Sequence, residues 1–506
     1  MAVETELKLS LSAAAAGRLR RHPLLASVTP ARQRLINCYY DTADLDLLHA
    51  GIAVRHRRTA WGWLLTVKSA EPAAGGLARR SEWEAPSQPD AFDFSHVDDK
   101  RLRGRLEAWR AALQPAFFTD FQRTTWLLEP APGVQVELAL DRGSIRHGER
   151  AEPLCEIELE LLAGPVAALF DLARALQAAL PLRPEAASKA ERGYRLFRDE
   201  ALQPVRAGRS PVDAGMSPIA AFRAVAFDCL EQLLRNEAGI RAGGDDPEFV
   251  HQARVAVRRL RSAMRLWQPL LPDDFLAAFR PAWRAFAQLL GEARNQDVFA
   301  TETLPLLAAS FPGYPVLKRL AAAAGRQRER SARAVRAAFA APPSGRLALD
   351  FSAAVHALPE LAVPAPLADF GERRLRRLAR RAARLASVAA GEPAAQHRLR
   401  IAVKQLRYAL ECLAPLYRRR RLRRYQAATA ELQALLGALN DIHVAGTLVV
   451  GYRLRSGGDL LGGWFGGRSA LLSARLPAAL DALAQAPAPW RKKRRGKGRR
   501  TKRGKR

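Results

Sequence analysis

The feature that most constrains the fold is the alternation of charged and apolar residues in the first 200 residues of this 506-residue chain. Segment 3–11 places Glu4, Glu6 and Lys8 on one side and Leu7 and Leu9 on the other. Because side chains alternate between the two faces of a β-strand, this period of two predicts a strand with one charged face. The same period, bounded by turn residues typical of antiparallel strands, recurs in segments 52–58, 63–69, 80–85, 121–128, 134–141 and 154–162.

Two arrangements explain these charged faces. An antiparallel sheet with one face in solvent produces the alternation directly. However, three glutamates on one face of a strand, such as Glu156, Glu158 and Glu160, repel one another unless cations lie between them. A closed barrel that turns the charges inward, around metal ions and an anionic ligand, removes this difficulty. Carboxylate oxygens suit Mg²⁺ or Mn²⁺, and Arg and Lys suit phosphate oxygens, so such a barrel would suit a metal-complexed polyphosphate.

An ordered series of motifs runs through residues 1–199. After Glu4-x-Glu6-x-Lys8 come NCYYDT (37–42), AVRHR (53–57), LLTVK (64–68), RSEWE (80–84), VELALDRG (136–143), CEIELEL (155–161) and SKAERGYRLF (188–197). This series resembles the CYTH domain of the triphosphate tunnel metalloenzymes, and most of all their bacterial inorganic triphosphatase branch. The resemblance implies an eight-stranded antiparallel β-tunnel with flanking helices, of the α+β class, that hydrolyses triphosphate with a divalent metal ion.

The resemblance also implies roles for the charged residues. Metal ions would be held by Glu4, Glu6 and a glutamate of the last strand, Glu156 or Glu158. Phosphate oxygens would be bound by Lys8, Arg55, Arg57, Lys68, Arg123, Lys189 and Arg192. A second metal ion or the attacking water would be positioned by Glu82, Glu84, Glu137 and Asp141. Catalysis itself is assigned to Glu4, Glu6, Lys8, Lys68 and Glu137.

The composition and periodicity of the chain change near residue 200. Beyond this point Ala, Leu and Arg are abundant, and apolar residues recur at helical spacing. We expect a linker at 200–216 and an all-α domain at 217–486. A loop-like stretch at 340–366 would divide this domain into repeats at about 217–340 and 367–486. The low-complexity tail 487–506 has no apolar face to bury, and we expect it to be disordered.

Two segments of the helical region share a ladder of basic residues. His251, Arg254, Arg258 and Arg261 recur at helical spacing, opposite an apolar face. The same spacing reappears 146 residues later in His397, Arg400, Lys404 and Arg407. Such an offset indicates an internal duplication. One basic helix face is most often simply solvated, but two matched ladders packed together would form a groove suited to a long polyanion.

The repeated histidine-and-cation helix resembles the CHAD domain, over about residues 217–486. The resemblance implies an all-α bundle that binds inorganic polyphosphate, associates with polyphosphate granules and has no catalytic activity of its own. The implied contacts are His251, Arg254, Arg258, Arg259, Arg261, His397, Arg400, Lys404, Arg407 and Tyr408.

Charge and cysteine content bound the remaining possibilities. The formal net charge of +31 implies a polyanionic partner without choosing among phosphate polymer, nucleic acid and anionic membrane. The basic tail would contact nucleic acid non-specifically through counterion release. The four dispersed cysteines favour neither a disulfide nor a metal-thiolate site. The N-terminus lacks the pattern of a signal peptide, and the apolar stretch 445–467 is interrupted by charges, so we expect a cytoplasmic protein without a membrane partner.

Taken together, these patterns predict a metal-dependent inorganic triphosphatase tunnel joined to a polyphosphate-binding helical module. Alternatives remain open: a catalytically idle polyphosphate-granule scaffold, a nucleic-acid-binding protein, or another tunnel chemistry such as thiamine triphosphate hydrolysis or adenylate cyclisation. No aromatic-rich sheet or recognition-helix motif favours base readout. The oligomeric state is not indicated by the sequence.

Overall fold

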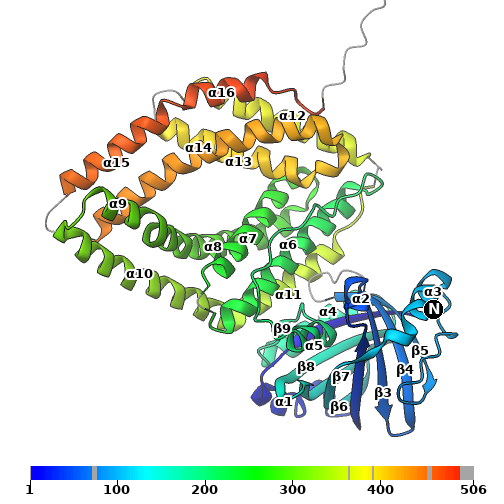
Figure 1. Ribbon diagram of the computed structural model, residues 1–506. Helices are drawn as coiled ribbons and strands as arrows, with labels where there is room; N and C mark the ends of the chain where they lie inside the picture. Colours follow the sequence, from blue (N-terminus) through cyan, green and yellow to red (C-terminus); the bar gives the residue numbers. More distant parts are fainter. Residues whose placement is uncertain are drawn as a thin grey trace, which may run out of the picture.

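The computed structural model describes residues 2–70, 77–244, 246–362, 365–389, 393–452 and 458–490. It contains a β-domain, formed by the first 200 residues, and a larger helical domain beside it (Figure 1). This confirms the predicted fold class. The domain boundaries at residues 199 and 217 stay predictions. The prediction of a disordered tail over 487–506 is wrong for its first residues, because Trp490 is buried in the helical core and packs against Tyr425; from residue 491 onward the tail lies outside the described residues.

The β-domain is one antiparallel sheet closed on itself. In the order β5-β4-β3-β2-β6-β7-β8-β1 each strand pairs with the next, and pairing of β5 with β1 closes the ring of eight. A two-residue strand, β9 (Arg183–Pro184), adds to the other side of β1. The eight strands are β1 (Ala2–Ser10), β2 (Ala31–Asp41), β3 (Ile52–Thr59), β4 (Gly62–Ala70), β5 (Leu77–Ser87), β6 (Gln114–Ala131), β7 (Val134–His147) and β8 (Arg150–Ala163).

Strand β2 is absent from the alternating segments identified in the sequence. Its buried half, Leu35 to Asp41, is almost continuously buried and so does not alternate between apolar and charged residues. Asn37 is fully buried and donates to Thr119 Oγ1 of β6 at 2.8 Å. A strand buried on both faces carries no period of two, which is why the pattern missed it.

The apolar faces of the strands point outward and are covered by helices. Leu7, Leu9, Leu138 and Leu159 form one core with helices α1 (Ala13–Leu19) and α4 (Ala167–Ala179). A second core on the opposite strands includes Val54 and packs against α3 (Lys100–Trp109). Two further helices, α2 (Asp46–His49) and α5 (Lys189–Phe197), lie at the barrel. With the apolar side chains taken up outside, the charged faces are directed into the barrel.

The helical domain repeats one packing pattern. Helices α6, α7 and α8 pack in succession, α12, α13 and α14 do the same, and α7 contacts α13. This arrangement matches the offset of 146 residues seen in the sequence. The helices are α6 (Pro218–Arg241), α7 (Glu248–Leu266), α8 (Asp273–Val298), α9 (Leu304–Ser310), α10 (Pro315–Ala340), α11 (Pro342–Ala357), α12 (Leu367–Ala386), α13 (Pro393–Cys412), α14 (Arg419–Gly451), α15 (Gly458–Ser473) and α16 (Leu476–Gln485). Short 3₁₀ or π turns lie at Pro23–Leu25, Arg110–Ala112, Gln268–Leu270, Phe299–Thr303 and Ala414–Leu416.

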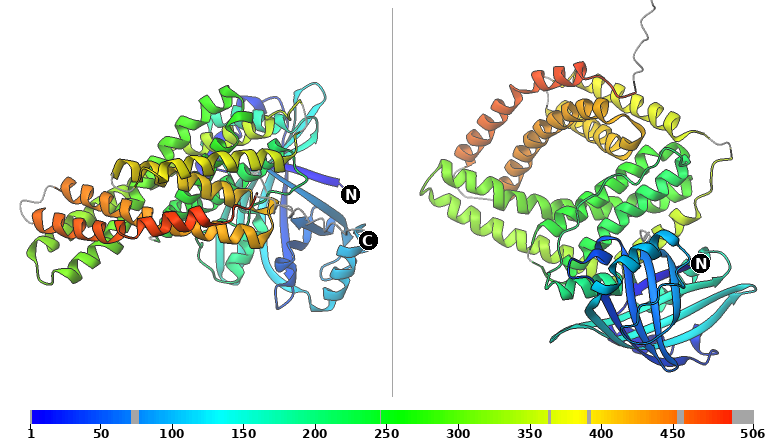
Figure 2. Two further views of the ribbon diagram at one scale, coloured as in Figure 1. Left: turned by 90° about the horizontal axis from the view of Figure 1, so that it is seen from above. Right: turned by 45° about the vertical axis from the view of Figure 1, so that its right-hand side comes forward.

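The expectation of a loop at 340–366 is wrong for its first half, because Pro342–Ala357 is helix α11. This helix lies against the β-domain in both views of Figure 2. Leu349 and Ala353 are buried in the same core as α4, and Arg174 donates to Asp350 at 3.0 Å. Gly345 is required here, since a Cβ would lie 2.8 Å from the carbonyl oxygen of Leu182. The helix has apolar residues on two sides, because Phe351 and Val355 are buried in the helical core while Leu349 and Ala353 are buried in the β-domain core, so no single apolar stripe marked it in the sequence.

One described helix, α14, is long and apolar enough by length and composition to cross a bilayer. The sequence analysis considered only the stretch 445–467 and did not anticipate this. The core helix of a soluble protein also meets these criteria of length and composition. Leu432, Leu436 and Leu439 of α14 are buried.

Candidate functional site

The inward faces of the barrel line a cavity of about 920 Å³. Within the described part of the chain, seven basic side chains and nine carboxylates line it. The basic ones are Lys8, Arg55, Arg57, Lys68, Arg123, Lys189 and Arg235. The carboxylates are Glu4, Glu6, Glu82, Glu84, Glu137, Glu158, Glu160, Glu191 and Glu231. The charged faces therefore surround an enclosed space rather than facing bulk solvent.

Opposite charges alternate along one wall of the cavity. Lys68 Nζ lies 2.8 Å from Glu4 Oε2 and 2.9 Å from Glu82 Oε2. On β3, Arg55 lies 3.7 Å from Glu82 and Arg57 lies 3.5 Å from Glu84. The strand register brings these residues together, because Lys68 of β4 is directly opposite Glu82 of β5. Although burial opposes it, the neighbouring Glu4 raises the pKa of Lys68, so this ammonium keeps its charge.

Arg55 has hydrogen-bonding capacity left over. Its Nη1 donates to the hydroxyl of Tyr39 at 3.1 Å, whereas its buried Nε and Nη2 have no hydrogen-bond partner among the described residues. A buried polar atom without a partner usually marks a place for a ligand, ion or water. These two nitrogens therefore identify a place for an acceptor inside the cavity.

Beside this cavity, Lys189 joins three carboxylates. Its Nζ lies 2.7 Å from Asp141, 2.5 Å from Glu156 and 2.8 Å from Glu158. The carboxylates offer oxygens that all lie within 4.8 Å of one another, a spacing that a metal ion could use. Asp141 and Glu156 are fully buried and, unlike Glu158, do not line the cavity. In this arrangement the ammonium of Lys189 supplies the neutralising charge.

Helix α5 holds Lys189 in place. Ser188 caps the helix by accepting from the N–H of Glu191, whose carboxylate in turn accepts from the N–H of Ser188 at 2.8 Å. Gly193 allows α5 to lie directly on β6, since a Cβ there would be 2.0 Å from the ring of Phe117. The first residue of the helix is thereby directed at the carboxylates.

The electrostatic environment of these carboxylates differs from one to the next. Burial raises the pKa of Glu156. The pKa of Glu158 is lowered well below its ordinary value, because Lys189, Lys8 and Arg123 together outweigh the opposing effect of burial. Arg123 donates to both oxygens of Asp141 at 2.8 and 2.7 Å and lies 2.5 Å from Glu158. Lys8 lies 3.3 Å from Glu158 and 3.7 Å from Glu6.

Sequence reasoning left Glu160 out of the candidate site. It lies opposite Glu6 in the β1–β8 register and opposite Glu137 in the β7–β8 register, and it lines the cavity. Burial, followed by repulsion from Glu4 and Glu137, raises the pKa of Glu160 to about 7. Burial likewise raises the pKa of Glu137. The signal was available, since Glu156, Glu158 and Glu160 share one period of two on β8.

Among the predicted phosphate contacts, Arg192 is the one that does not line the cavity. It pairs with Glu152 at 2.7 Å, reaches Glu156 at 3.4 Å and donates to the carbonyl oxygen of Pro153. These partners hold Arg192 on the outer side of α5. The other predicted phosphate contacts all line the cavity.

In the helical domain, α7 and α13 bring four basic side chains together: Arg254, Arg258, Arg400 and Lys404. We call these four residues the cation cluster. Within the described residues, none of them has a carboxylate partner within 4.0 Å. Arg258 lies over the ring of Tyr408, with its guanidinium carbon 5.1 Å from the ring centre. The two matched ladders thus meet across the α7–α13 contact.

The charges of the cation cluster are poorly compensated. Burial, followed by repulsion from Arg258, lowers the pKa of Arg254 to about 10. Burial, followed by repulsion from Arg400 and Arg258, lowers the pKa of Lys404 to about 7. Four buried atoms around the cluster have no hydrogen-bond partner among the described residues: His251 Nδ1, Arg258 Nε, Arg400 Nε and Tyr408 Oη. Unpartnered donors next to unpaired cations indicate an anion site.

The other predicted polyphosphate contacts are distributed less evenly. His251, Arg258, Arg407 and Tyr408 line a hollow of about 450 Å³ beside the cluster, and Arg407 pairs there with Glu411 at 2.9 Å. Arg259 instead turns to α6, where it pairs with Asp228 at 2.7 Å and donates to Gln232 at 2.9 Å.

Two further contacts of this set complete the description. Burial, followed by repulsion from Arg284, lowers the pKa of Arg261. His397 is exposed, whereas its counterpart His251 is half-buried, so the two histidines of the duplication are not equivalent.

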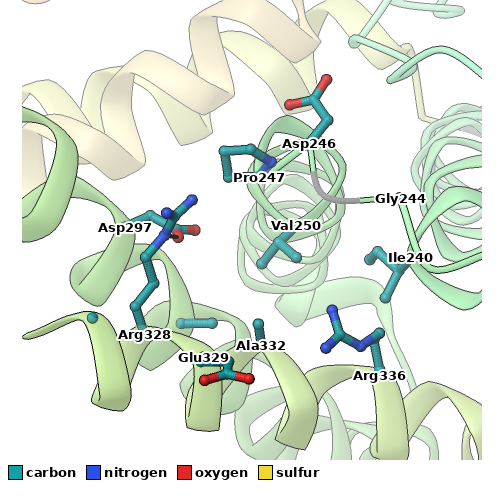
Figure 3. A pocket seen from close by; sticks show the side chains of 12 residues that line it. Ile240, Gly244, Asp246, Pro247, Val250, Asp297, Arg328, Glu329, Ala332 and Arg336 are labelled. Atoms are coloured by element: carbon teal, nitrogen blue, oxygen red, sulfur yellow. Dashed lines mark hydrogen bonds and ion pairs between the residues drawn. The ribbon is translucent and has the colours of Figure 1, made fainter.

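A further hollow, of about 470 Å³, lies between the α6–α7 turn, α8 and α10 (Figure 3). Charges of both signs surround it, and Arg328 pairs with Asp297 at 2.7 Å. Its floor includes Ile240 and Val250. Its paired charges distinguish it from the cation cluster.

A closed antiparallel tunnel with charges inside, followed by a duplicated helical domain, defines a class of two-domain proteins. Comparison with known families agrees: the CYTH domain model matches residues 2–194 and the CHAD domain model matches residues 224–450. The chain belongs to the proteins in which a CYTH domain is followed by a CHAD domain.

Individual relatives support both halves. A Haemophilus influenzae protein named inorganic triphosphatase is 35% identical over 202 residues, which are 39% of this chain and 55% of that protein. The chain thus spans about half the length of this relative. The crystal structure of a CHAD domain from the plant Ricinus communis is 31% identical, with a TM-score of 0.50, and covers 57% of this chain and 99% of that one.

Proposed function

We propose that the tunnel hydrolyses inorganic triphosphate and other short-chain polyphosphates with Mg²⁺ or Mn²⁺. The observation that carries this proposal is the charge composition of the cavity. Its basic side chains suit phosphate oxygens, but the carboxylates outnumber them. Triphosphate carries several negative charges. A cavity lined by more carboxylates than basic side chains would repel it unless divalent cations entered with it. The similarity to a protein named inorganic triphosphatase supports the same reaction.

The donor set of the cavity fits a hard divalent cation. Glu4, Glu6 and Glu160 are carboxylates that line one cavity, and burial, followed by repulsion from Glu4 and Glu137, raises the pKa of Glu160 to about 7. These three, with Glu158, would hold the ion. Glu82 and Glu84 line the cavity farther along β5 and would take a second ion. Asp141 and Glu156 instead serve as anchors for Lys189. When bound, the ion would neutralise phosphate charge in the transition state.

The remaining lining residues would bind and orient the substrate. Lys8, Arg55, Arg57, Lys68 and Arg123 would donate to the phosphate oxygens, with the unpartnered nitrogens of Arg55 as the clearest free donors. Glu137, whose pKa is raised, would accept a proton from the attacking water. Because phosphoryl transfer needs little covalent chemistry, positioning and charge stabilisation by these side chains would provide most of the rate enhancement.

The test is phosphate release from tripolyphosphate by the full chain. We expect Glu4→Gln and Glu6→Gln to lower kcat by at least about a hundredfold, because each removes a carboxylate needed for the metal ion. Glu149→Gln, in the exposed turn between β7 and β8, is the matched control and should keep wild-type kcat. Wild-type protein that releases no phosphate with either metal would favour the scaffold alternative. Mutants as active as the control would refute the tunnel assignment.

A second function is favoured by the cation cluster. We propose that the helical domain binds inorganic polyphosphate across α7 and α13, since unpaired cations and unpartnered donors converge there. Binding of a long-chain polyphosphate, with DNA as competitor at fixed salt, tests this. Polyphosphate should displace DNA, and the reverse would favour the nucleic-acid alternative. With this activity the protein would act in the cytoplasm and associate with polyphosphate granules.

A further inference from the structure

Two residues that line the tunnel cavity come from the helical domain. Glu231 and Arg235 lie one turn apart on α6, yet they line the same cavity as Glu4 and Lys189. Every other lining residue in the described part of the chain lies within the first 200 residues. Because α6 lies outside the barrel (Figure 1), its side chains can reach only an end of the tunnel. The helical domain therefore forms part of the tunnel mouth.

Arg235 is held at this mouth by two carboxylates, one from each domain. Its Nε donates to Glu231 Oε1 at 2.6 Å, and its Nη2 donates to Glu191 Oε1 at 2.8 Å. Glu191 is itself fixed by the cap at Ser188, the residue before Lys189. The guanidinium of Arg235 is thus bonded to Glu191, which lies on the same turn of α5 as Lys189. Lys189 in turn contacts the buried carboxylates Asp141 and Glu156.

The bonds of Arg235 leave donors free. A guanidinium carries five N–H groups in a planar fork that matches phosphate geometry. The recorded bonds use Nε and Nη2, and among the described residues none accepts from Nη1. Glu231 Oε2 is buried and also has no hydrogen-bond partner in the described part of the chain. The group at the mouth that an incoming phosphate could use is Arg235 Nη1, because it is a donor, whereas the Glu231 oxygen is an acceptor.

We propose that Arg235 binds the outermost phosphoryl group of a triphosphate in the tunnel and so sets the preference for triphosphate over pyrophosphate. This inference rests on the proposed triphosphatase activity and adds a substrate-binding residue from the helical domain. A triphosphate whose inner phosphates lie against the β-strand cations extends one unit farther than pyrophosphate. Arg235 contacts that last unit, so it contributes to binding of the longer substrate and not of the shorter one.

The experiment compares Arg235→Ala with Arg241→Ala in the full chain. Arg241 is an exposed residue at the end of the same helix, so its loss changes the net charge equally. We expect Arg235→Ala to raise the KM for tripolyphosphate about tenfold, the effect of one charged hydrogen bond, with kcat within about twofold of wild type. The inhibition constant of pyrophosphate should stay within about twofold. Arg235→Lys should recover part of the KM.

Other outcomes separate a binding role from a structural one. Equal KM values for the two alanine variants would overturn the inference, and so would a lowered melting temperature with an unchanged KM. Should Arg235→Ala fail to fold, Arg235→Gln, which removes the charge but retains one amide donor group, is measured in its place. Wild-type protein that releases no phosphate would contradict the proposed function, whereas active wild type with an unaltered Arg235→Ala variant would contradict this inference alone.

Discussion

The tunnel and the cation cluster both collect basic side chains, but they compensate them in opposite ways. In the tunnel most cations are paired with carboxylates, as in Lys68 between Glu4 and Glu82. In the cluster, Arg254 and Lys404 are surrounded by other cations, and their pKa values fall. An acidic lining needs metal ions before it accepts a polyanion, whereas a cationic cluster needs the polyanion itself. Under the proposed functions, similar basic side chains would therefore serve catalysis in one domain and binding in the other.

The largest expected effect concerns the tunnel, where basic side chains are paired with carboxylates. Replacing Lys189 by Met leaves Asp141 and Glu156 buried without their ammonium partner. Breaking a buried ion pair from one side costs about 3–5 kcal/mol of unfolding free energy. Chemical denaturation of the full chain measures this loss, with Lys100→Met at the exposed start of α3 as control. An unchanged midpoint would mean that the three carboxylates do not depend on Lys189.

The second prediction tests whether the excess carboxylates of the tunnel serve a metal ion. Glu160→Gln removes one lining carboxylate without altering the shape of the side chain. We expect Mn²⁺ affinity, measured by calorimetry, to fall about tenfold or more, since even outer ligand partners contribute this much. Glu129→Gln, exposed at the far end of β6, should bind Mn²⁺ like wild type. Equal affinities would separate Glu160 from the metal site.

The third prediction concerns the cation cluster, where basic side chains have no carboxylate partners among the described residues. Arg254→Met should weaken polyphosphate binding about tenfold, because it removes one charged hydrogen-bond donor. The same change should leave the unfolding free energy equal or higher, since it relieves repulsion from Arg258 and Arg400. Fluorescence titration and denaturation of one preparation measure both quantities. If Arg254→Met lowered both the unfolding free energy and the affinity for polyphosphate, Arg254 would stabilise the fold as Lys189 does, and the predicted difference between the two sites would be wrong.

The smallest expected effect is a pH dependence of polyphosphate binding. Lys404, with a pKa of about 7, is mostly protonated at pH 6 and mostly neutral at pH 8. Its charged neighbours are Arg400 on α13, Arg254 and Arg258 on α7, and Asp441, which favours protonation. A polyanion binds the protonated form better, so affinity should fall a few-fold as the pH rises from 6 to 8. Binding titrations at several pH values measure this change.

The matched variant for this prediction is Lys404→Met, which should flatten the profile. The pKa of His251 is lowered from its ordinary value, mainly through burial. The stability effect of Lys404 has the opposite sign. The unfolded chain binds this proton up to a higher pH, so unfolding free energy should rise between pH 7 and 10. A wild-type profile as flat as that of the variant would contradict the low pKa.

Much of the fold could be predicted because charge alternation reports directly on strand faces. The alternating segments, the closed eight-stranded ring and the duplicated ladders are all confirmed in outline. The pattern missed β2, which is buried on both faces, and α11, whose apolar residues are divided between the cores of both domains. A regular alternation of apolar and charged residues shows which face of an element is buried. It gives no information about an element that is buried on both faces.

The candidate site was predictable as a set of charges but not as a set of pairs. Sequence spacing placed Lys8, Arg55 and Lys68 on inward faces, yet it could not show that Arg192 lies outside. Nor could it show that Arg259 turns to α6. Glu231 and Arg235 were beyond reach, because only the docking of the two domains brings α6 to the tunnel.

Helix α11 has a consequence for how the protein is made. Leu349 and Ala353 complete the core beneath α4, although they follow the last barrel strand by more than 150 residues. At translation rates of about 5–20 residues per second, that apolar surface stays uncovered for roughly 10–30 seconds after the barrel has emerged from the ribosome. The core beneath α4 is therefore completed only after α11 has been synthesised.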